Sequence, residues 1–164
     1  MINSKETQIE ILKFVLSRTR GAEKKLEMLN KQLQFVMDKM NHPIDGISYK
    51  PTIGGGGGIN DGAADIPIRA DEIEHKIQHQ RDVLAGCILQ GSAILDELDA
   101  KSDERAILSA YYIGGQRYEE ISAHFGWDTS TIWRKMRIGY DRLIQIPRIQ
   151  DMLAEAEEEW RKSL

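Results

Sequence analysis

Apolar or small residues in the N-terminal part of the chain recur at alternating spacings of three and four. This spacing places one stripe along a helix and repeats every seven residues, as in a coiled coil. The stripe consists of Leu12, Val15, Thr19, Ala22, Leu26, Leu29, Leu33, Val36 and Met40. It stops before Asn41, His42 and Pro43, residues that end helices. The sequence therefore predicts one long helix before Pro43.

A second stripe of the same kind lies within residues 70–98. Its members are Ile73, Ile77, Leu84, Ile88, Gly91, Leu95 and Leu98. The two predicted helices would pack antiparallel, either as a hairpin within one chain or as a dimer of two chains. Periodicity alone does not decide between these two arrangements.

Between the two stripes, about residues 43–69, the periodicity disappears and the run GGGGG occurs. A phosphate-binding loop needs Lys and then Ser or Thr directly after its last glycine, and here the residues Ile, Asn and Asp follow instead. Consecutive glycines have a large backbone entropy. We therefore expect a flexible connector and no nucleotide loop.

The pattern changes near residue 100, where three short amphipathic segments with start and stop residues follow one another. The segments are SDERAILSAYYIGG, QRYEEISAHFG and WDTSTIWRKMRIGYDRLIQIP. Ser102 or Asp103 is expected to cap the first helix and Asp128 the third. Gly126 is expected to end the second helix and Pro147 the third. Three helices around a small core are predicted.

The expected core of these three helices is formed by Ile107, Leu108, Tyr111, Ile121, Phe125, Ile132, Met136, Tyr140 and Leu143. The predicted fold class is all-α, with a long N-terminal helical hairpin or coiled coil followed by a trihelical helix-turn-helix domain. The expected boundaries are 1–99 for the hairpin, 100–148 for the helix-turn-helix domain and 149–164 for an acidic C-terminal tail.

Residues 119–137 have the spacing of a helix-turn-helix. If Ile132, Met136 and Tyr140 face inward, the opposite arc of the third helix faces solvent. Hydroxyls, an aromatic ring and arginines on this arc suit the DNA major groove, where a guanidinium pairs with guanine. The residues expected to read DNA are Thr129, Ser130, Thr131, Trp133, Arg134 and Arg137. The residues expected to contact the DNA backbone are Arg117, Tyr118, Lys135 and Arg142.

Residues 103–143, above all YEEISAHFGWDTSTIWRKMRIGYDRL, resemble region four of bacterial sigma factors and the ArpU-like regulators of late phage transcription. The resemblance implies a phage or prophage regulator that binds promoter-proximal duplex DNA through the second helix of the pair. It leaves a contact with RNA polymerase open. Sigma-type recognition helices carry charged residues where Thr129, Ser130 and Thr131 stand here, so promoter specificity does not transfer.

Charge is unevenly distributed along the chain. The formal net charge of -4 and the pI near 5.6 exclude a uniformly basic coat for nucleic acid. The cations gather instead in the last predicted helix of the helix-turn-helix domain, and acidic residues follow in the tail 149–164. This tail is expected either to dock as a final helix or to act as a negative arm that competes with DNA.

Candidate chemistry outside this region is sparse. Glu72, His75, His79 and Asp82 share one helix face and are plausible metal ligands, but a di-metal bundle needs matching ligands on partner helices. We therefore expect a solvated polar face, with no metal and no cofactor. A single cysteine, Cys87, excludes an internal disulfide. Without a signal peptide, a membrane-helix run or a catalytic constellation, a cytoplasmic protein that is not an enzyme is expected.

The leading hypothesis is a sequence-specific DNA-binding transcription regulator whose N-terminal helices form a homodimer or contact a partner. The alternatives are a helical protein-protein adaptor that binds through its heptads and a phage DNA-packaging subunit. The salt dependence of affinity distinguishes these hypotheses. A DNA-binding protein loses affinity steeply as salt rises, because phosphate contacts release counterions, whereas an adaptor bound through apolar heptads barely responds.

Overall fold

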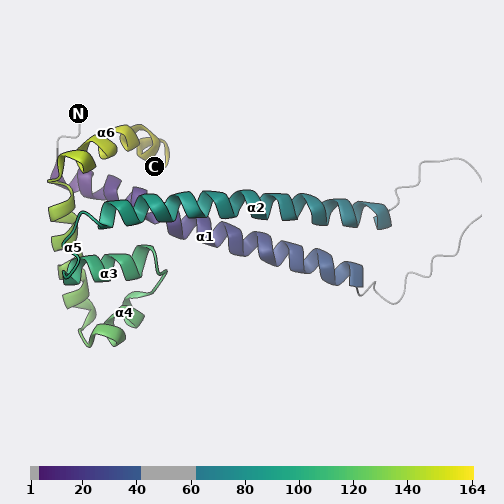
Figure 1. Cartoon of the computed structure of the whole chain (residues 1–164), viewed down its shortest axis with the longest axis horizontal. Coiled ribbons are helices and arrows are strands. Elements are labelled where there is room, and N and C mark those ends of the chain that lie inside the picture. The colour runs from purple at the N-terminus through teal and green to yellow at the C-terminus, as the bar shows by residue number, and fades with distance from the viewer. Residues whose placement is uncertain (1–3, 42–61) are drawn as a thin grey trace, which may run out of the picture. The chain divides into compact units, whose positions relative to one another are not determined.

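The computed structural model describes residues 4–41 and 62–164, with side chains from Ile68 onward in the second range, and these residues form six α-helices without a strand (Figure 1). The helices are α1 (Lys5–Asn41), α2 (Gly62–Leu95), α3 (Asp103–Tyr112), α4 (Tyr118–Phe125), α5 (Thr129–Leu143) and α6 (Pro147–Lys162). The predicted all-α class is confirmed, with long N-terminal helices followed by three helices in helix-turn-helix order.

The chain divides into two compact units whose boundaries fall inside α1 and α2. Unit 1 comprises residues 1–23 and 83–164, and unit 2 comprises residues 24–82. This division differs from the boundaries expected at 99 and 148. The physical reason is that the start of α1, the end of α2 and α6 all place buried side chains in the same core as the three short helices.

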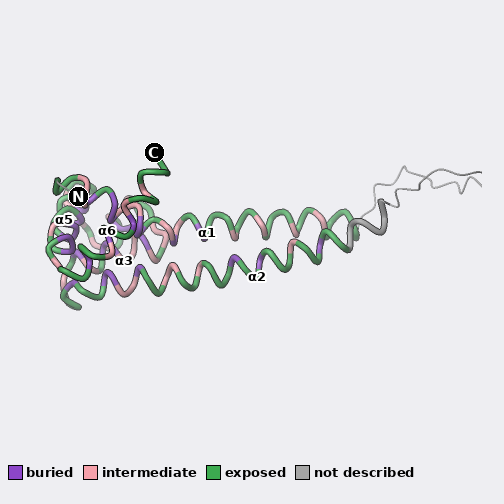
Figure 2. The backbone as a smooth tube through the Cα atoms, turned by 90° about the horizontal axis from the view of Figure 1, so that it is seen from above, coloured by how far each residue is buried: buried purple, intermediate pink, exposed green. Residues whose placement is uncertain are grey.

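Unit 1 contains a single hydrophobic core to which six helices contribute. Figure 2 shows that buried residues are concentrated in this unit. Removing a large aliphatic side chain from water contributes roughly 1.5–3 kcal/mol. The largest fully buried side chains are Ile9, Ile11, Leu12, Leu16, Leu95, Ile107, Leu108, Ile121, Ile132, Leu143 and Leu153.

Most of the core predicted for the three short helices is buried. Tyr111 and Phe125 are exceptions, because they are half-buried and pack against the edge of the core. Tyr112 takes the interior position instead, and its hydroxyl lies 2.6 Å from the hydroxyl of Tyr140. This pairing satisfies two buried polar groups.

Gly139 allows α5 to cross α3 closely. A Cβ atom at this position would lie 2.6 Å from Leu108 Cδ1 and 3.2 Å from Glu104 Cβ. Both distances are shorter than the roughly 3.5–4.0 Å of a favourable carbon-carbon contact. The missing side chain therefore helps to set how closely α5 lies on the core.

The starts of α3 and α5 have the caps that the sequence predicts. Ser102 Oγ accepts a hydrogen bond from the backbone N–H of Arg105 at 3.3 Å. Asp128 Oδ1 accepts one from the backbone N–H of Thr131 at 2.8 Å. Each cap satisfies an amide that has no partner inside its helix.

Pro147 does not end the third short helix, so that prediction is wrong. Helix α5 ends at Leu143, and Pro147 is the first residue of α6. Proline is favoured at this position because its missing N–H would have had no helical partner and its backbone is already suited to the helix. The tail is therefore a helix in its own right.

Helix α6 docks on unit 1 through one apolar face. Ile149, Leu153 and Ala156 on this face are buried. A salt bridge of 2.5 Å joins Glu159 to Arg18 of α1. Of the two arrangements expected for the acidic tail, the structure therefore has the docked helix.

In unit 2, the later turns of α1 and the earlier turns of α2 run antiparallel and side by side (Figures 1 and 2). The part of the α1 stripe that lies in unit 2 is only half-buried from Leu26 to Val36, and its last member, Met40, is exposed. Two helices alone cover only a narrow stripe, whereas unit 1 adds further helices around its core.

The glycine-rich segment lies in residues 42–61, outside the described residues. Since α2 begins at Gly62, the connector expected up to about residue 69 ends earlier.

Candidate nucleic-acid interface

The turn between α4 and α5 is held by hydrogen bonds and ring stacking. Gly126 ends α4 with a φ of 71°, and its N–H donates to the Ser122 carbonyl at 2.9 Å. The Ser122 hydroxyl donates to the carbonyl of Trp127. The Trp127 ring stacks on Phe125 with centroids 5.1 Å apart. These contacts fix the direction in which α5 leaves α4, as a helix-turn-helix requires.

Asp128 caps the first turn of α5 and accepts hydrogen bonds from two of the hydroxyl residues that were expected to read DNA. Besides the Thr131 amide, its Oδ1 accepts from the Ser130 hydroxyl at 3.1 Å. Hydrogen bonds from the side chain and backbone of Thr131, followed by the one from Ser130, lower the pKa of Asp128. Ser130 and Thr131 therefore stabilise the cap in the free protein.

The Asp128→Asn variant should remove a pH-dependent part of the stability. The folded-state pKa lies below the ordinary value of about 3.9, so the carboxylate contributes fully above that pH and the contribution is lost as pH falls through the folded pKa. Asparagine caps helices equally well but does not titrate. Relative to the variant, the wild-type Tm should fall as the pH drops from about 5 to 2. Thermal unfolding followed by circular dichroism measures this difference.

Asp151→Asn on α6 is the matched control, because Asp151 is exposed and no hydrogen bond or ion pair of its side chain occurs among the described residues. A Tm difference between wild type and Asp128→Asn that is the same at every pH would contradict the charged cap.

The first two turns of α5 present an exposed surface formed by Thr129, Ser130, Trp133 and Arg134. The Trp133 side chain is 61% exposed and lies against the Tyr118 ring at a centroid distance of 5.2 Å. Arg134 makes no hydrogen bond or ion pair with the described residues and interacts only electrostatically with Asp128. In Figure 1 this end of α5 lies beside α4, and its other end leads to α6. The guanidinium of Arg134 is therefore available to a ligand.

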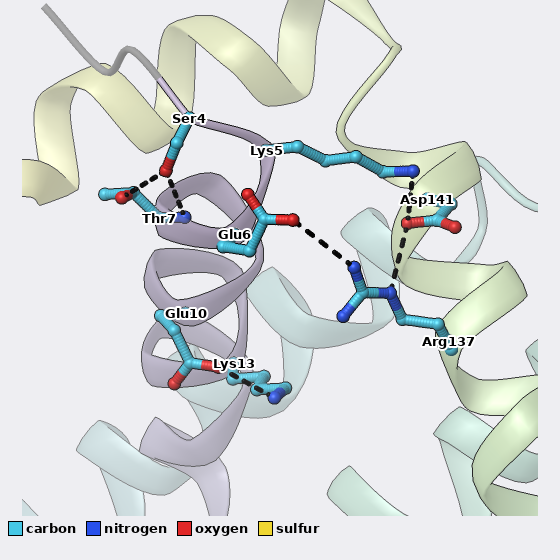
Figure 3. Close-up of polar contacts among 8 residues, drawn as sticks. All are labelled: Ser4, Lys5, Glu6, Thr7, Glu10, Lys13, Arg137 and Asp141. Atoms are coloured by element: carbon cyan, nitrogen blue, oxygen red, sulfur yellow. Dashed lines mark hydrogen bonds and ion pairs between the residues drawn. The ribbon is translucent and has the colours of Figure 1, made fainter.

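Arg137 lies on the same arc but has acidic partners (Figure 3). Its Nε is 3.5 Å from Asp141 Oδ1, and its Nη2 is 3.9 Å from Glu6 Oε1 on α1. Lys5 Nζ approaches the same Asp141 oxygen at 3.1 Å. The pair with Glu6 is exposed and of the kind that contributes about 0.2–1 kcal/mol, whereas Asp141 is half-buried and its Oδ1 atom is buried, so Asp141 holds Arg137 more firmly. In the free protein Arg137 joins α5 to the first turn of α1.

The four candidates for backbone contacts fall into two groups. Lys135 and Arg142 pair with carboxylates of α3 at 2.9 and 3.4 Å. Lys135 also lies over the Trp127 ring, 4.6 Å from its centroid. Arg117 and Tyr118 lie at the start of α4, where Arg117 is exposed and Tyr118 half-buried. The structure thus brings Tyr118 next to the exposed arc and places Lys135 and Arg142 against α3.

Sequence reasoning missed the contribution of α1 to this region. Glu6 pairs with Arg137, and Lys13 lies over the Tyr140 ring, 5.6 Å from its centroid. A signal was present in the sequence, because Ile9 and Ile11 add apolar surface beside the coiled-coil stripe. A helix with apolar side chains on more than one face packs against more than one neighbouring element.

The described part of the chain contains no group of three or more His, Cys, Asp or Glu side chains arranged to hold a metal ion. Within the same residues, none of the helices has both the length and the hydropathy needed to cross a bilayer. His75, one of the possible ligands considered above, lies on exposed α2 surface with Nε2 3.6 Å from Asp71 Oδ2.

A comparison of the chain with family models, curated proteins and solved structures finds no match.

Proposed function

We propose that this protein is a sequence-specific regulator of transcription that binds duplex DNA with α4 and α5. The observation that carries the proposal is the guanidinium of Arg134, which is exposed and has no ion pair or hydrogen bond among the described residues, next to the exposed ring of Trp133. Both stand on the first two turns of a helix that a glycine turn and an aspartate cap hold in place. The major groove admits such a helix, and an arginine at its N-terminal half reaches guanine O6 and N7.

The distribution of charge supports this proposal despite the net charge of -4. Helix α5 carries Arg134, Lys135, Arg137 and Arg142 against Asp141 alone. The acidic helix α6 follows the C-terminal end of α5, away from the exposed first turns (Figure 1). Because Lys135, Arg137 and Arg142 pair with carboxylates, Arg134 is the cation that would attract phosphates at the exposed end of α5.

The wider proposal follows the resemblance to sigma region four and to ArpU-like regulators. It places the protein among phage or prophage regulators, without catalytic activity and with RNA polymerase as a further partner. A homodimer through the N-terminal helices is part of the proposal, supported by Met28 and Phe35 of unit 2, which are 61% and 64% exposed. They lie seven residues apart on one helix face.

The direct test is to retain fragments of the source genome on the purified protein at low and near-physiological salt and to sequence them. One enriched sequence, with affinity that falls steeply as salt rises, is the expected result because phosphate contacts release counterions. Retention of all fragments alike would remove sequence specificity from the proposal, and no retention at either salt would overturn it.

The Arg134→Ala variant should bind the enriched site more weakly by about 1–3 kcal/mol, the contribution of a bidentate arginine-guanine pair. Preference at one base position should relax at the same time. Fluorescence anisotropy with a set of singly substituted duplexes measures both effects. Arg161→Ala is the matched control, because Arg161 is an exposed arginine of α6 that pairs with Glu157 of its own helix. An equal loss on every duplex would assign Arg134 to phosphate instead.

The second candidate is a helical protein-protein adaptor. The exposed Met28 and Phe35 favour it, since apolar side chains on a helix face are typical of protein contacts. An adaptor bound through this face would be nearly insensitive to salt. Substituting Met28 and Phe35 by Gln would abolish an adaptor complex, whereas a DNA-binding regulator would lose its dimer contact but keep the binding of α5 to a duplex.

A further inference from the structure

A cleft of about 300 Å³ opens within unit 1 between α1, α3 and the helix-turn-helix. Its lining is dominated by aromatic rings, with Tyr111, Tyr118 and Trp133 among the more accessible ones. Lys13 of α1 and Arg137 of α5 add two cations. The volume lies at the lower end of the range of about 300–1,000 Å³ that is usual for small-ligand sites.

The accessible rings form a continuous row. Tyr111 and Tyr118 are stacked, with centroids 4.8 Å apart and planes 15° from parallel. Tyr118 continues to Trp133 at 5.2 Å. The guanidinium of Arg20 lies over the Tyr111 ring at 4.3 Å from its centroid. Tyr111 and Tyr118 are already in contact with neighbouring groups, so Trp133, which ends the row and is 61% exposed, is the ring that can offer a face to a further flat ring.

The polar groups of the cleft are donors at neutral pH. Burial raises the pKa of Tyr140 to about 12 and raises the pKa of Tyr112 and Tyr118 above the ordinary value. The phenols therefore keep their protons, and the hydroxyls of Tyr112 and Tyr140 lie 2.6 Å apart. Lys13 pairs with Glu10 at 2.8 Å on the surface, an ion pair that a phosphate would replace readily.

We propose that this cleft binds a nucleotide, with its base stacked on Trp133 at the end of the ring row and its phosphate beside Lys13. Flat rings recognise the base, and cations near them recognise the phosphate. A free mononucleotide and an unpaired nucleotide of a single strand offer the same chemistry. The inference goes beyond the proposed function and does not depend on binding of duplex DNA.

The test is a titration followed by the indole N–H signals in NMR spectra, assigned with single Trp→Phe variants. The probes are adenosine monophosphate, adenosine and a short single-stranded oligodeoxyadenylate. We expect saturable shifts of the Trp133 signal with the nucleotide, and weaker binding of adenosine, which lacks the phosphate. Equal affinity for mononucleotide and oligomer identifies a free nucleotide as the ligand. Binding of the oligomer alone identifies an unpaired strand.

Two variants tie the binding to this cleft. Lys13→Gln should reduce affinity for adenosine monophosphate by about tenfold, to that of adenosine, through loss of a charge-assisted contact. Lys39→Gln in unit 2 removes the same charge outside the cleft and should leave affinity unchanged. Ser17 lines the cleft and is exposed, so Ser17→Phe should fill it and abolish binding while the thermal melt stays near that of wild type.

Shifts confined to Trp127 or Trp160, unchanged binding by Ser17→Phe, or no binding of any probe would overturn the proposal. Retention of duplex fragments is measured in parallel on the same samples. If the protein retains duplex DNA but binds no nucleotide, only the cleft proposal is wrong. If it binds nucleotide but retains no duplex DNA, only the proposed function is wrong.

Discussion

The Ile132→Asp variant should unfold unit 1. Ile132 has no exposed surface and lies in the core between the helices of the helix-turn-helix and α3. An aspartate there would bury a carboxylate without a partner, which is among the most destabilising of single substitutions. We expect a loss of about 4 kcal/mol or more, a large part of the 5–15 kcal/mol typical of a whole domain. Urea unfolding followed by circular dichroism and by tryptophan fluorescence measures the loss.

Ile138→Asp on the same helix is the matched control, because Ile138 is 37% exposed and an aspartate there remains in contact with water. Its cost should stay within about 0.5 kcal/mol. A wild-type unfolding curve for Ile132→Asp would contradict the inward direction of Ile132. It would also turn Trp133 and Arg134 away from the exposed arc, and the proposed DNA contact would have to be assigned to other residues.

Features of the fold that depend on neighbouring residues could be predicted from the sequence. The caps at Ser102 and Asp128 and the left-handed glycine at Gly126 are local, because each depends on a hydrogen bond or a backbone angle within a few residues. The inward face of α5 followed from helical spacing alone. These features position most of the exposed arc.

Contacts between distant segments could not be predicted in the same way. The start of α1 completes the core beside α5, and this moves the boundary between the compact units into α1 and α2. Helical periodicity shows that a face is apolar but does not identify the element that covers it. Pro147 illustrates the same limit, since proline both follows helices and begins them.

The ion pairs of the candidate site could be predicted from the sequence only in part. A count of cations along α5 treats Arg134 and Arg137 alike, yet Arg134 has no ion pair among the described residues and Arg137 contacts Asp141 and Glu6. The pair with Asp141 is an i,i+4 contact within α5, whereas the pair with Glu6 depends on the placement of α1. This difference makes Arg134 the better residue for a test of the proposed DNA binding.

Deleting residues 147–164 should destabilise unit 1, because α6 covers part of its core. Ile149 and Leu153 are 2% and 0% exposed, and Ala156 joins them on the same face. At roughly 1.5–3 kcal/mol for each large aliphatic side chain removed from water, the loss is on the order of 5 kcal/mol. The milder Leu153→Ala variant should lose about 2–5 kcal/mol by leaving a cavity. Thermal and urea unfolding of both variants measures these losses.

Neutralising acids on the outer surface of α6 separates docking from electrostatic competition. Asp151 and Glu155 are exposed, so Asp151→Asn combined with Glu155→Gln removes negative charge and leaves the apolar face in place. This double variant should unfold like wild type, and its affinity for duplex DNA should rise less than about twofold, because exposed charges are screened beyond roughly 10 Å at 0.1 M salt. If the deletion leaves unfolding unchanged and the double variant binds DNA much more tightly, α6 acts as a negative arm and its buried face does not stabilise unit 1.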